Sequence, residues 1–177
     1  MSTAQTIYAL ATPPGKSGVA VVRISGPRAR DTLHDLGVSA TVPPRVATLV
    51  RLTHGGQDID QALALSFPAP HSFTGEDVLE LHTHGSRAVI GTLLDALATL
   101  PGLRLAEPGE FARRAFLNDK FDLAQAEAIA DLIDAETASQ HAQALRQLGG
   151  GLTERVEALR EKILEPLALL EAYIDFP

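Results

Sequence analysis

Residues 108–135 read PGEFARRAFLNDKFDLAQAEAIADLIDA, and the sequence changes character within them. Before this stretch, short runs of β-branched residues are broken by glycine and proline, a pattern typical of strands and turns. After it, an alanine-rich pattern with three- and four-residue spacing is typical of helices and continues to the last residue. Because Lys120 is an isolated lysine at the joint, we expect function where the two regions meet.

Composition limits the classes of protein that this chain can represent. Its 177 residues, 45% of them hydrophobic, suffice for one ordinary domain and part of another. It has no cysteine, which excludes disulfides, thiolate metal sites and a cysteine nucleophile within these residues. A net charge of −7 argues against a surface that binds nucleic acid mainly by neutralising phosphates.

The sequence gives no sign of secretion or membrane insertion. The N-terminus, MSTAQTIY, lacks a basic segment followed by an apolar run. Nowhere do about 18 uncharged apolar residues follow one another, as a membrane-spanning helix requires. We therefore expect a cytoplasmic protein without membrane contact.

The region before the joint predicts an α+β domain with a mixed or mainly antiparallel sheet. Paired glycines within residues 54–58 favour a hairpin between two alternating runs. Ser86 can cap a helix that ends before Pro101, and Gly26-Pro27 favours the start of a short helix that reaches Gly37. The expected strands are residues 6–11, 19–25, 45–53, 59–67, 78–83 and 103–106.

Two motifs in this region suggest chemistry but fail on detail. Residues 15–17, Gly-Lys-Ser, resemble the end of a phosphate-binding loop, yet Leu10 stands where that motif requires its first glycine. His82 and His84 share one face of a strand at a spacing compatible with a metal, but no third ligand is fixed nearby. The histidines are therefore interpreted as structural, and residues 15–17 as structural or as a dimer contact.

Two charged residues are harder to explain as parts of an ordinary sheet. Arg23 lies among the apolar residues of one expected strand, and Glu80 among those of another. A charge at such a position is costly to bury unless it is paired or meets a polar ligand. Two interpretations stay open: exposed or mutually paired charges without further role, or a ligand site.

The region after the joint predicts helices. A short helix is expected over residues 110–117, and Asp122 with Gln125 has the pattern of a capping box. From there the apolar spacing predicts one helix that continues to Leu148. The glycines of residues 149–151 end it and permit a reversal.

The last helix has a regular apolar stripe that two helices cannot cover between them. Its spacing is that of a helix packed against other helices, and Pro166 predicts a kink. We expect an incomplete all-α bundle, finished by a continuation beyond Pro177 or by another subunit. The expected domains are residues 1–118 and 119–177. The stripe comprises Leu152, Val156, Leu159, Ile163, Leu167, Leu170 and Ile174.

Four blocks of the sequence resemble a known family. They are ATPPGKSGVAVVRISG at residues 11–26, SFTGEDVLELHTHG at 72–85, the stretch 108–135 and IDFP at 174–177. In order, and over nearly the whole chain, they are similar to the tRNA uridine-5-carboxymethylaminomethyl modification GTPases, called MnmE or TrmE. The resemblance implies a first domain like the folate-binding domain of the glycine cleavage T-protein, followed by the first helices of a helical domain.

The resemblance also implies a ligand, partners and site residues. The family binds 5-formyltetrahydrofolate or a related one-carbon tetrahydrofolate, with contacts at positions that match Arg23, Glu80 and Lys120. A carboxylate such as Glu80 can accept two hydrogen bonds from a pterin edge, while Arg23 and Lys120 can hold the formyl oxygen or the glutamate tail. Family members dimerise through the first domain and act with the FAD protein MnmG on the wobble uridine of tRNA.

These residues lack part of the family's machinery. The sequence has no GxxxxGK[ST] loop, no NKxD motif and no Cys-x-Gly-Lys. GTP hydrolysis, with its K⁺ and Mg²⁺, is therefore expected only from a GTPase domain outside these residues, and neither a catalytic residue nor a metal site is expected here. The sequence leaves open which folate derivative binds, whether it binds without the missing C-terminal segment, how the GTP state is relayed, and why the chain ends at Pro177.

Two alternatives to a folate-binding part of this enzyme stay open. One is a dimerisation scaffold in which the same charges form only salt bridges. The other is an independent aminomethyltransferase-like enzyme, which would need a catalytic acid, and no candidate stronger than Glu80 is found.

Overall fold

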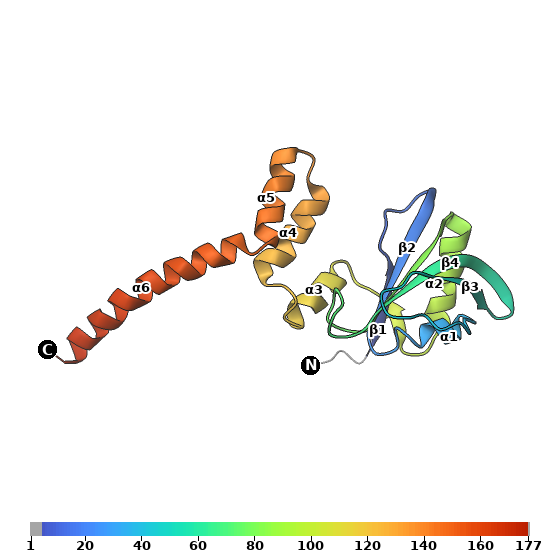
Figure 1. Ribbon diagram of the computed structural model, residues 1–177, viewed down its shortest axis with the longest axis horizontal. Coiled ribbons are helices and arrows are strands. Elements are labelled where there is room, and N and C mark those ends of the chain that lie inside the picture. Colours follow the sequence, from blue (N-terminus) through green and yellow to red (C-terminus); the bar gives the residue numbers. More distant parts are fainter. Residues whose placement is uncertain (1–4, 177) are drawn as a thin grey trace. The chain divides into compact units, whose positions relative to one another are not determined.

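The computed structural model describes residues 5–176, and the chain forms two compact units, each of which is described by itself (Figure 1). The first unit ends at Lys120 and the second begins at Phe121. Among the described residues, the first unit contains a six-stranded sheet and three helices, and the second contains three helices. The predicted fold class, an α+β domain followed by a helical region, is confirmed.

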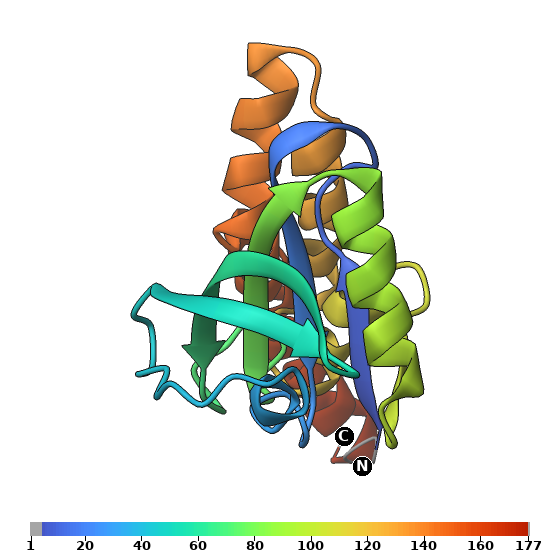
Figure 2. The same cartoon turned by 90° about the vertical axis from the view of Figure 1, so that its right-hand side faces the viewer.

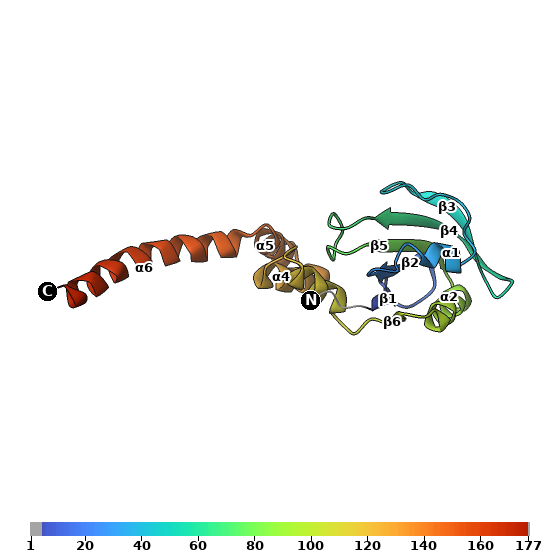
Figure 3. The same ribbon diagram turned by 90° about the horizontal axis from the view of Figure 1, so that it is seen from below.

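One mixed sheet is the frame of the first unit. Its strands are β1 (Thr6–Leu10), β2 (Ser17–Ser25), β3 (Thr48–His54), β4 (Gln57–Phe67), β5 (Val78–Gly85) and β6 (Leu103–Leu105). Their order is β3-β4-β5-β2-β1-β6, so that β3 and β6 form the two edges (Figure 3). All neighbours are antiparallel except β1 and β6, which are parallel.

The core lies between one face of the sheet and helix α2 (Arg87–Thr99). This helix contacts β1, β4, β5 and β6 and runs alongside the sheet in Figure 2. It begins as predicted, because Ser86 Oγ accepts the N–H of Val89 at 3.1 Å. Large, fully buried core side chains are Val22, Ile24, Leu36, Leu52, Leu79, Leu81, Leu93 and Leu97.

The hairpin between β3 and β4 forms as the paired glycines predict. Gly55 and Gly56 have φ values of 57° and 79°. Both lie in the left-handed region, which the two central residues of a type I′ turn require. His54 and Gln57 pair across this turn and set the register of the two strands.

The first helix is shorter than the sequence indicates. Helix α1 spans only Thr32–Asp35, so the prediction that it starts at Pro27 was wrong. The N–H of Arg28 donates to Thr6 Oγ1 at 2.9 Å. Because this bond holds the segment against β1, the residues after the proline form separate turns before the regular helix begins.

The second unit begins with helix α4 (Leu123–Asp134), which packs against α5 (Ala138–Leu148) (Figure 1). The predicted capping box is present, because Asp122 and Gln125 exchange side chain to backbone hydrogen bonds. The Gln125 amide also donates to the carbonyl of Leu148 at 2.9 Å. This glutamine therefore ties the start of one helix to the end of the other.

The prediction of one continuous helix over this part of the chain was wrong. Backbone at Ala135 is extended and ends α4. Thr137 then caps α5, and Gln140 closes a second capping box with it. The sequence signal was the Thr-x-x-Gln spacing, which the apolar stripe obscured because Thr137 also fits that stripe.

The last helix, α6 (Gly151–Asp175), forms with its apolar stripe uncovered. Within residues 5–176 none of its side chains is buried, and Leu159 and Ile174 are 58% and 67% exposed. The helix continues through Pro166, and the kink there stays a prediction. Among the helices of the described chain, none combines the length and apolarity needed to cross a membrane.

Candidate functional site

Arg23 and Glu80 face each other on the side of the sheet opposite the core. They are directly paired across β2 and β5, while their sequence neighbours Val22 and Leu81 point into the core. Arg23 Nε donates to Glu80 Oε1 at 2.9 Å, and Arg23 Nη2 lies 2.8 Å from the same oxygen. The two side chains are 25% and 16% exposed. The charges thus compensate each other while part of each remains open to solvent.

Two aromatic rings flank the guanidinium of Arg23. Phe73 belongs to the loop of residues 68–77, called the β4–β5 loop below, and its ring centre lies 5.0 Å from the guanidinium carbon. The ring centre of Phe111, in α3 (Glu110–Leu117), lies at 5.8 Å. Both distances suit cation–π attraction. One carboxylate and two rings therefore hold Arg23 in place.

The second carboxylate oxygen of Glu80 is less engaged. It lies 3.4 Å from His82 Nε2. This distance exceeds the usual range of about 2.7–3.2 Å for N–H···O hydrogen bonds. Oε2 therefore keeps capacity to accept a hydrogen bond, whereas Oε1 already meets two nitrogens of Arg23.

Lys120 reaches the β4–β5 loop from the end of α3. Its Nζ donates to the carbonyl of Pro70 at 3.0 Å. A Cβ placed on Gly75 would lie 3.3 Å from Lys120 Cδ, so glycine leaves room for the lysine stem. The structure thus joins Arg23 and Glu80 directly, whereas Lys120 is related to them through the loop that carries Phe73.

The Gly-Lys-Ser motif and the histidine pair lie at the ends of strands, and their structural interpretation stays a prediction. The Lys16-Ser17 step leads into β2, whereas the lysine and serine of a phosphate-binding loop open a helix. His84 Nδ1 lies 2.8 Å from Asp60 Oδ1, so the two strand histidines approach different carboxylates. No group of three or more His, Asp or Glu residues that could hold a metal occurs within residues 5–176.

A buried ionic network includes two residues of α3, the helix that carries Phe111. Glu110 and Arg114, both in α3, are 1% and 3% exposed and meet at 3.1 Å. Arg104 donates to both oxygens of Glu110, at 2.5 and 2.7 Å. These bonds, with the N–H of Glu107 and Arg114, outweigh the opposing effect of burial and lower the pKa of Glu110 to about 2. The network therefore stays ionised in the folded protein.

The same network reaches the β4–β5 loop. Arg114 Nη1 donates to both oxygens of Glu76, at 2.9 and 3.2 Å. Glu76 also accepts the hydroxyl of Ser25 at 2.8 Å, and that hydroxyl lies 2.7 Å from Thr74 Oγ1. Asn118 donates to the carbonyl of Thr74 at 2.7 Å. Helix α3, the loop and β2 are thus bonded to one another.

Sequence reasoning missed this network. Glu110 and Arg114 stand four residues apart on a helix, which is the spacing of an ordinary surface ion pair. Glu76 lies 38 residues before Arg114, so no local pattern connects them. Charged residues beside Phe111 are equally typical of an exposed helix face, so they gave no signal of burial.

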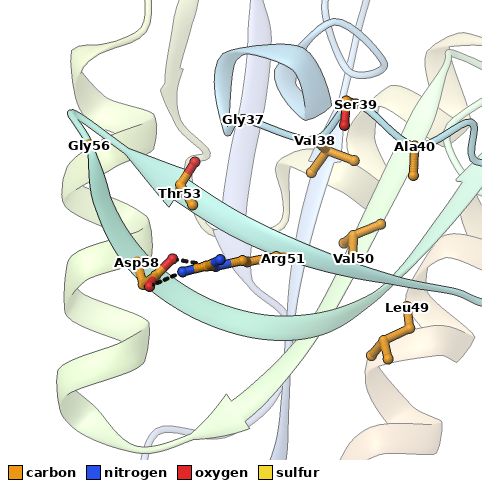
Figure 4. A pocket seen from close by; sticks show the side chains of 10 residues that line it. All are labelled: Gly37, Val38, Ser39, Ala40, Leu49, Val50, Arg51, Thr53, Gly56 and Asp58. Atoms are coloured by element: carbon orange, nitrogen blue, oxygen red, sulfur yellow. Dashed lines mark hydrogen bonds and ion pairs between the residues drawn. The ribbon is translucent and has the colours of Figure 1, made fainter.

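A separate groove of about 520 Å³ lies between edge strand β3 and residues 37–40 (Figure 4). Leu49 and Val50 line it on the strand side. At the hairpin end Arg51 Nε donates to Asp58 Oδ1 at 2.6 Å. Hydrogen bonding from Arg51 lowers the pKa of Asp58. None of the three predicted site residues lines this groove, so it is distinct from the Arg23 site.

Comparison with known proteins assigns both parts of the chain to one family. The family described as GTP-binding protein TrmE N-terminus matches residues 6–120, and the MnmE helical domain matches residues 123–177. Three relatives named tRNA modification GTPase MnmE are similar over nearly the whole chain. They come from Parvibaculum lavamentivorans (55% identical over 98% of this chain), Phenylobacterium zucineum (55% over 97%) and Paramagnetospirillum magneticum (57% over 97%).

The matches cover only part of each relative. The chain spans 40%, 38% and 39% of the lengths of these three proteins. Residues 6–120, the larger part of the chain, match the TrmE N-terminus. The chain therefore belongs to the TrmE family of GTP-binding proteins, whose relatives named above are tRNA modification GTPases MnmE.

Proposed function

We propose that this chain is the folate-binding, dimerising part of a tRNA modification GTPase. In this proposal it presents a one-carbon tetrahydrofolate, such as 5-formyltetrahydrofolate, in the cytoplasm. With the FAD protein MnmG, the assembled enzyme installs the carboxymethylaminomethyl group on C5 of the wobble uridine of tRNA. GTP hydrolysis, with K⁺ and Mg²⁺, belongs to the part of the relatives' length that this chain does not span.

The observation that carries the proposal is the partly open Arg23–Glu80 pair beside two aromatic rings. An ion pair at such a partly open position adds at most modest stability by itself. Here the pair is 25% and 16% exposed and lies within the TrmE-matching part of the chain. A planar ligand with hydrogen-bond donors at one edge and an anionic tail fits this combination of carboxylate, cations and rings.

The residues present fit a folate. Glu80 Oε2 is available to accept an N–H from the pterin ring, and a second donor would share Oε1 with Arg23. Lys120, which donates to the backbone carbonyl of Pro70, is the cation best placed to exchange that bond for an anionic tail. When bound, the folate supplies the one-carbon unit. The chain's own residues bind and orient it.

Isothermal titration with 5-formyltetrahydrofolate tests this proposal. The unsubstituted chain should release heat on binding, and Glu80→Ala should abolish it because the ring donors lose their acceptor. Asp58→Ala is the matched control, since it removes the carboxylate of another arginine pair on the same sheet. Unchanged binding in Glu80→Ala would defeat the site assignment.

The alternative is a dimerisation scaffold without a working folate site. It is favoured by the direct Arg23–Glu80 bond, which already satisfies both charges, and by exposed Val19, Leu49 and Leu63 on strands of the same sheet. Sedimentation separates the two functions. A dimer that gives no heat with 5-formyltetrahydrofolate supports the scaffold, whereas a dimer that binds it supports the folate site.

A further inference from the structure

The two rings beside Arg23 come from segments that are far apart in the sequence. Phe73 lies in the β4–β5 loop and Phe111 in the first turn of α3. Neither segment by itself sets the distance between the rings. Some contact between loop and helix must therefore fix how the rings enclose the guanidinium.

Arg114 makes the buried ion pair among these contacts. From the buried side of α3 it donates to both oxygens of Glu76 in the loop, at 2.9 and 3.2 Å. It also donates to Glu110 Oε1 at 3.1 Å and to the carbonyl of Gln5 at 3.1 Å. One side chain, 3% exposed, thus connects the loop, the helix and the residue before β1.

Further hydrogen bonds hold Glu76, the loop residue that Arg114 contacts. Glu76 accepts the hydroxyl of Ser25, which lies on β2 two residues after Arg23. Asn118, one turn beyond Arg114, donates to the carbonyl of Thr74. The loop ends of these contacts are one and three residues after Phe73, and the helix ends are three and seven residues after Phe111, so a shift of the loop relative to the helix would break them.

We propose that Arg114 is a positioning residue of the Arg23–Glu80 site, holding Phe73 and Phe111 at the spacing at which they enclose Arg23. As a determinant of folate affinity, this inference rests on the proposed folate function. Arg114 does not touch the ligand. It acts through Glu76 and the two rings.

Arginine is required here by geometry and not by charge alone. The guanidinium presents donors in a rigid fork, which lets Arg114 serve Glu76, Glu110 and Gln5 at the same time. A lysine has the same charge on a single nitrogen and cannot reach all three. Arg114→Lys therefore keeps the charge balance of the network while removing the two hydrogen bonds by which Arg114 holds Glu76 of the loop.

Fluorine NMR on the chain labelled with 4-fluorophenylalanine tests, without any ligand, whether Arg114 positions the two rings. The chain has six phenylalanines. Arg114→Lys should shift and broaden the signals of Phe73 and Phe111 and leave that of Phe176, which follows the last residue of α6 in the second unit. Arg113→Lys, a neighbour 58% exposed, is the matched control and should move neither ring signal. Unmoved signals for both rings in Arg114→Lys would overturn the positioning role.

Titration with 5-formyltetrahydrofolate connects the positioning to the site. We expect Arg114→Lys to weaken binding about tenfold and Arg113→Lys to leave it unchanged. Phe111→Leu should weaken binding too. The variant that combines Arg114→Lys with Phe111→Leu should bind with nearly the affinity of whichever single variant binds more weakly, because both changes remove the same enclosure of Arg23. Additive losses would show that Arg114 acts independently of the rings and would contradict the inference.

The outcomes separate failure of this inference from failure of the proposed function. If the unsubstituted chain does not bind the folate, the proposed function is wrong, and the ring signals still decide whether Arg114 positions them. Glu76→Gln gives a second variant in case Arg114→Lys does not fold, because the amide keeps the size of the side chain and loses the ion pair. It should shift the same two ring signals, and unchanged signals would count against the inference.

Discussion

The sheet unit and the helical unit treat their apolar residues differently. In the first unit, the apolar residues of alternating strand positions are covered by α2, and Leu79, Leu81 and Leu93 are fully buried. In the second, α6 has an equally regular stripe that nothing within the described chain covers. Periodicity therefore predicts that an element has an apolar face, but not what covers it.

If burial decides stability, replacing a buried leucine of the first unit should cost far more than replacing an exposed leucine of the second. Leu79→Ala should lower the free energy of unfolding of the first unit by about 2–5 kcal/mol, since it leaves a cavity in a closed core. Leu159 in α6 is 58% exposed, so Leu159→Ala should change the free energy of unfolding of the second unit by no more than about 0.5 kcal/mol. Urea unfolding followed by circular dichroism measures both. Equal losses would mean that the stripe of α6 is covered in solution.

Buried and exposed charges should differ in the same way. Glu110 and Asp58 both bond to arginine, but Glu110 is 1% exposed and Asp58 58%. The bonds from Arg104 lower the pKa of Glu110 from 4.5 to about 2. A carboxyl with a lowered folded-state pKa stabilises the protein above its unfolded pKa, and this stabilisation is lost as pH falls through the folded pKa. We expect a loss of about 3 kcal/mol between about pH 5 and 2.

Urea midpoints measured across this pH range check the effect. Glu110→Gln should be less stable at neutral pH and should flatten the acid dependence, because the titrating group is gone. Asp58→Asn should retain most of the slope. If the stability of Glu110→Gln still falls as steeply with decreasing pH, other carboxyls cause the loss of stability in acid.

The smallest effect is expected in the helical unit, where a single side chain caps α5. Thr137→Ala removes the side-chain cap of α5 and should cost about 1 kcal/mol of local stability. Hydrogen exchange of the amides of Ser139 and Gln140 should rise, whereas exchange in the sheet stays unchanged. Faster exchange throughout the chain would show that the two units unfold together.

Local patterns predicted much of the fold. The strand alternation placed Arg23 and Glu80 among apolar strand residues, and the capping residues Ser86 and Asp122 lie where they were expected. These features depend on neighbours within a few residues, which a sequence displays directly. The second cap at Thr137 was equally local and was missed because the apolar spacing suggested continuity.

The site itself depends on contacts that no local pattern contains. Arg23 meets Glu80 from 57 residues away, and the register of β2 on β5 decides that they meet. Lys120 bonds a carbonyl in an irregular loop 50 residues earlier. The role of Arg114 is the extreme case, since its helical spacing from Glu110 is that of an ordinary surface pair while its side chain is buried.

One titration of 5-formyltetrahydrofolate into three chains tests most directly whether Arg23, Glu80 and Lys120 of the first unit form one folate site. The unsubstituted chain should bind one equivalent. Lys120→Ala should bind measurably more weakly, whereas Lys162→Ala, the matched change in α6 of the second unit, should bind like the unsubstituted chain. Absence of binding to the unsubstituted chain, or equal affinity of all three, would contradict the account.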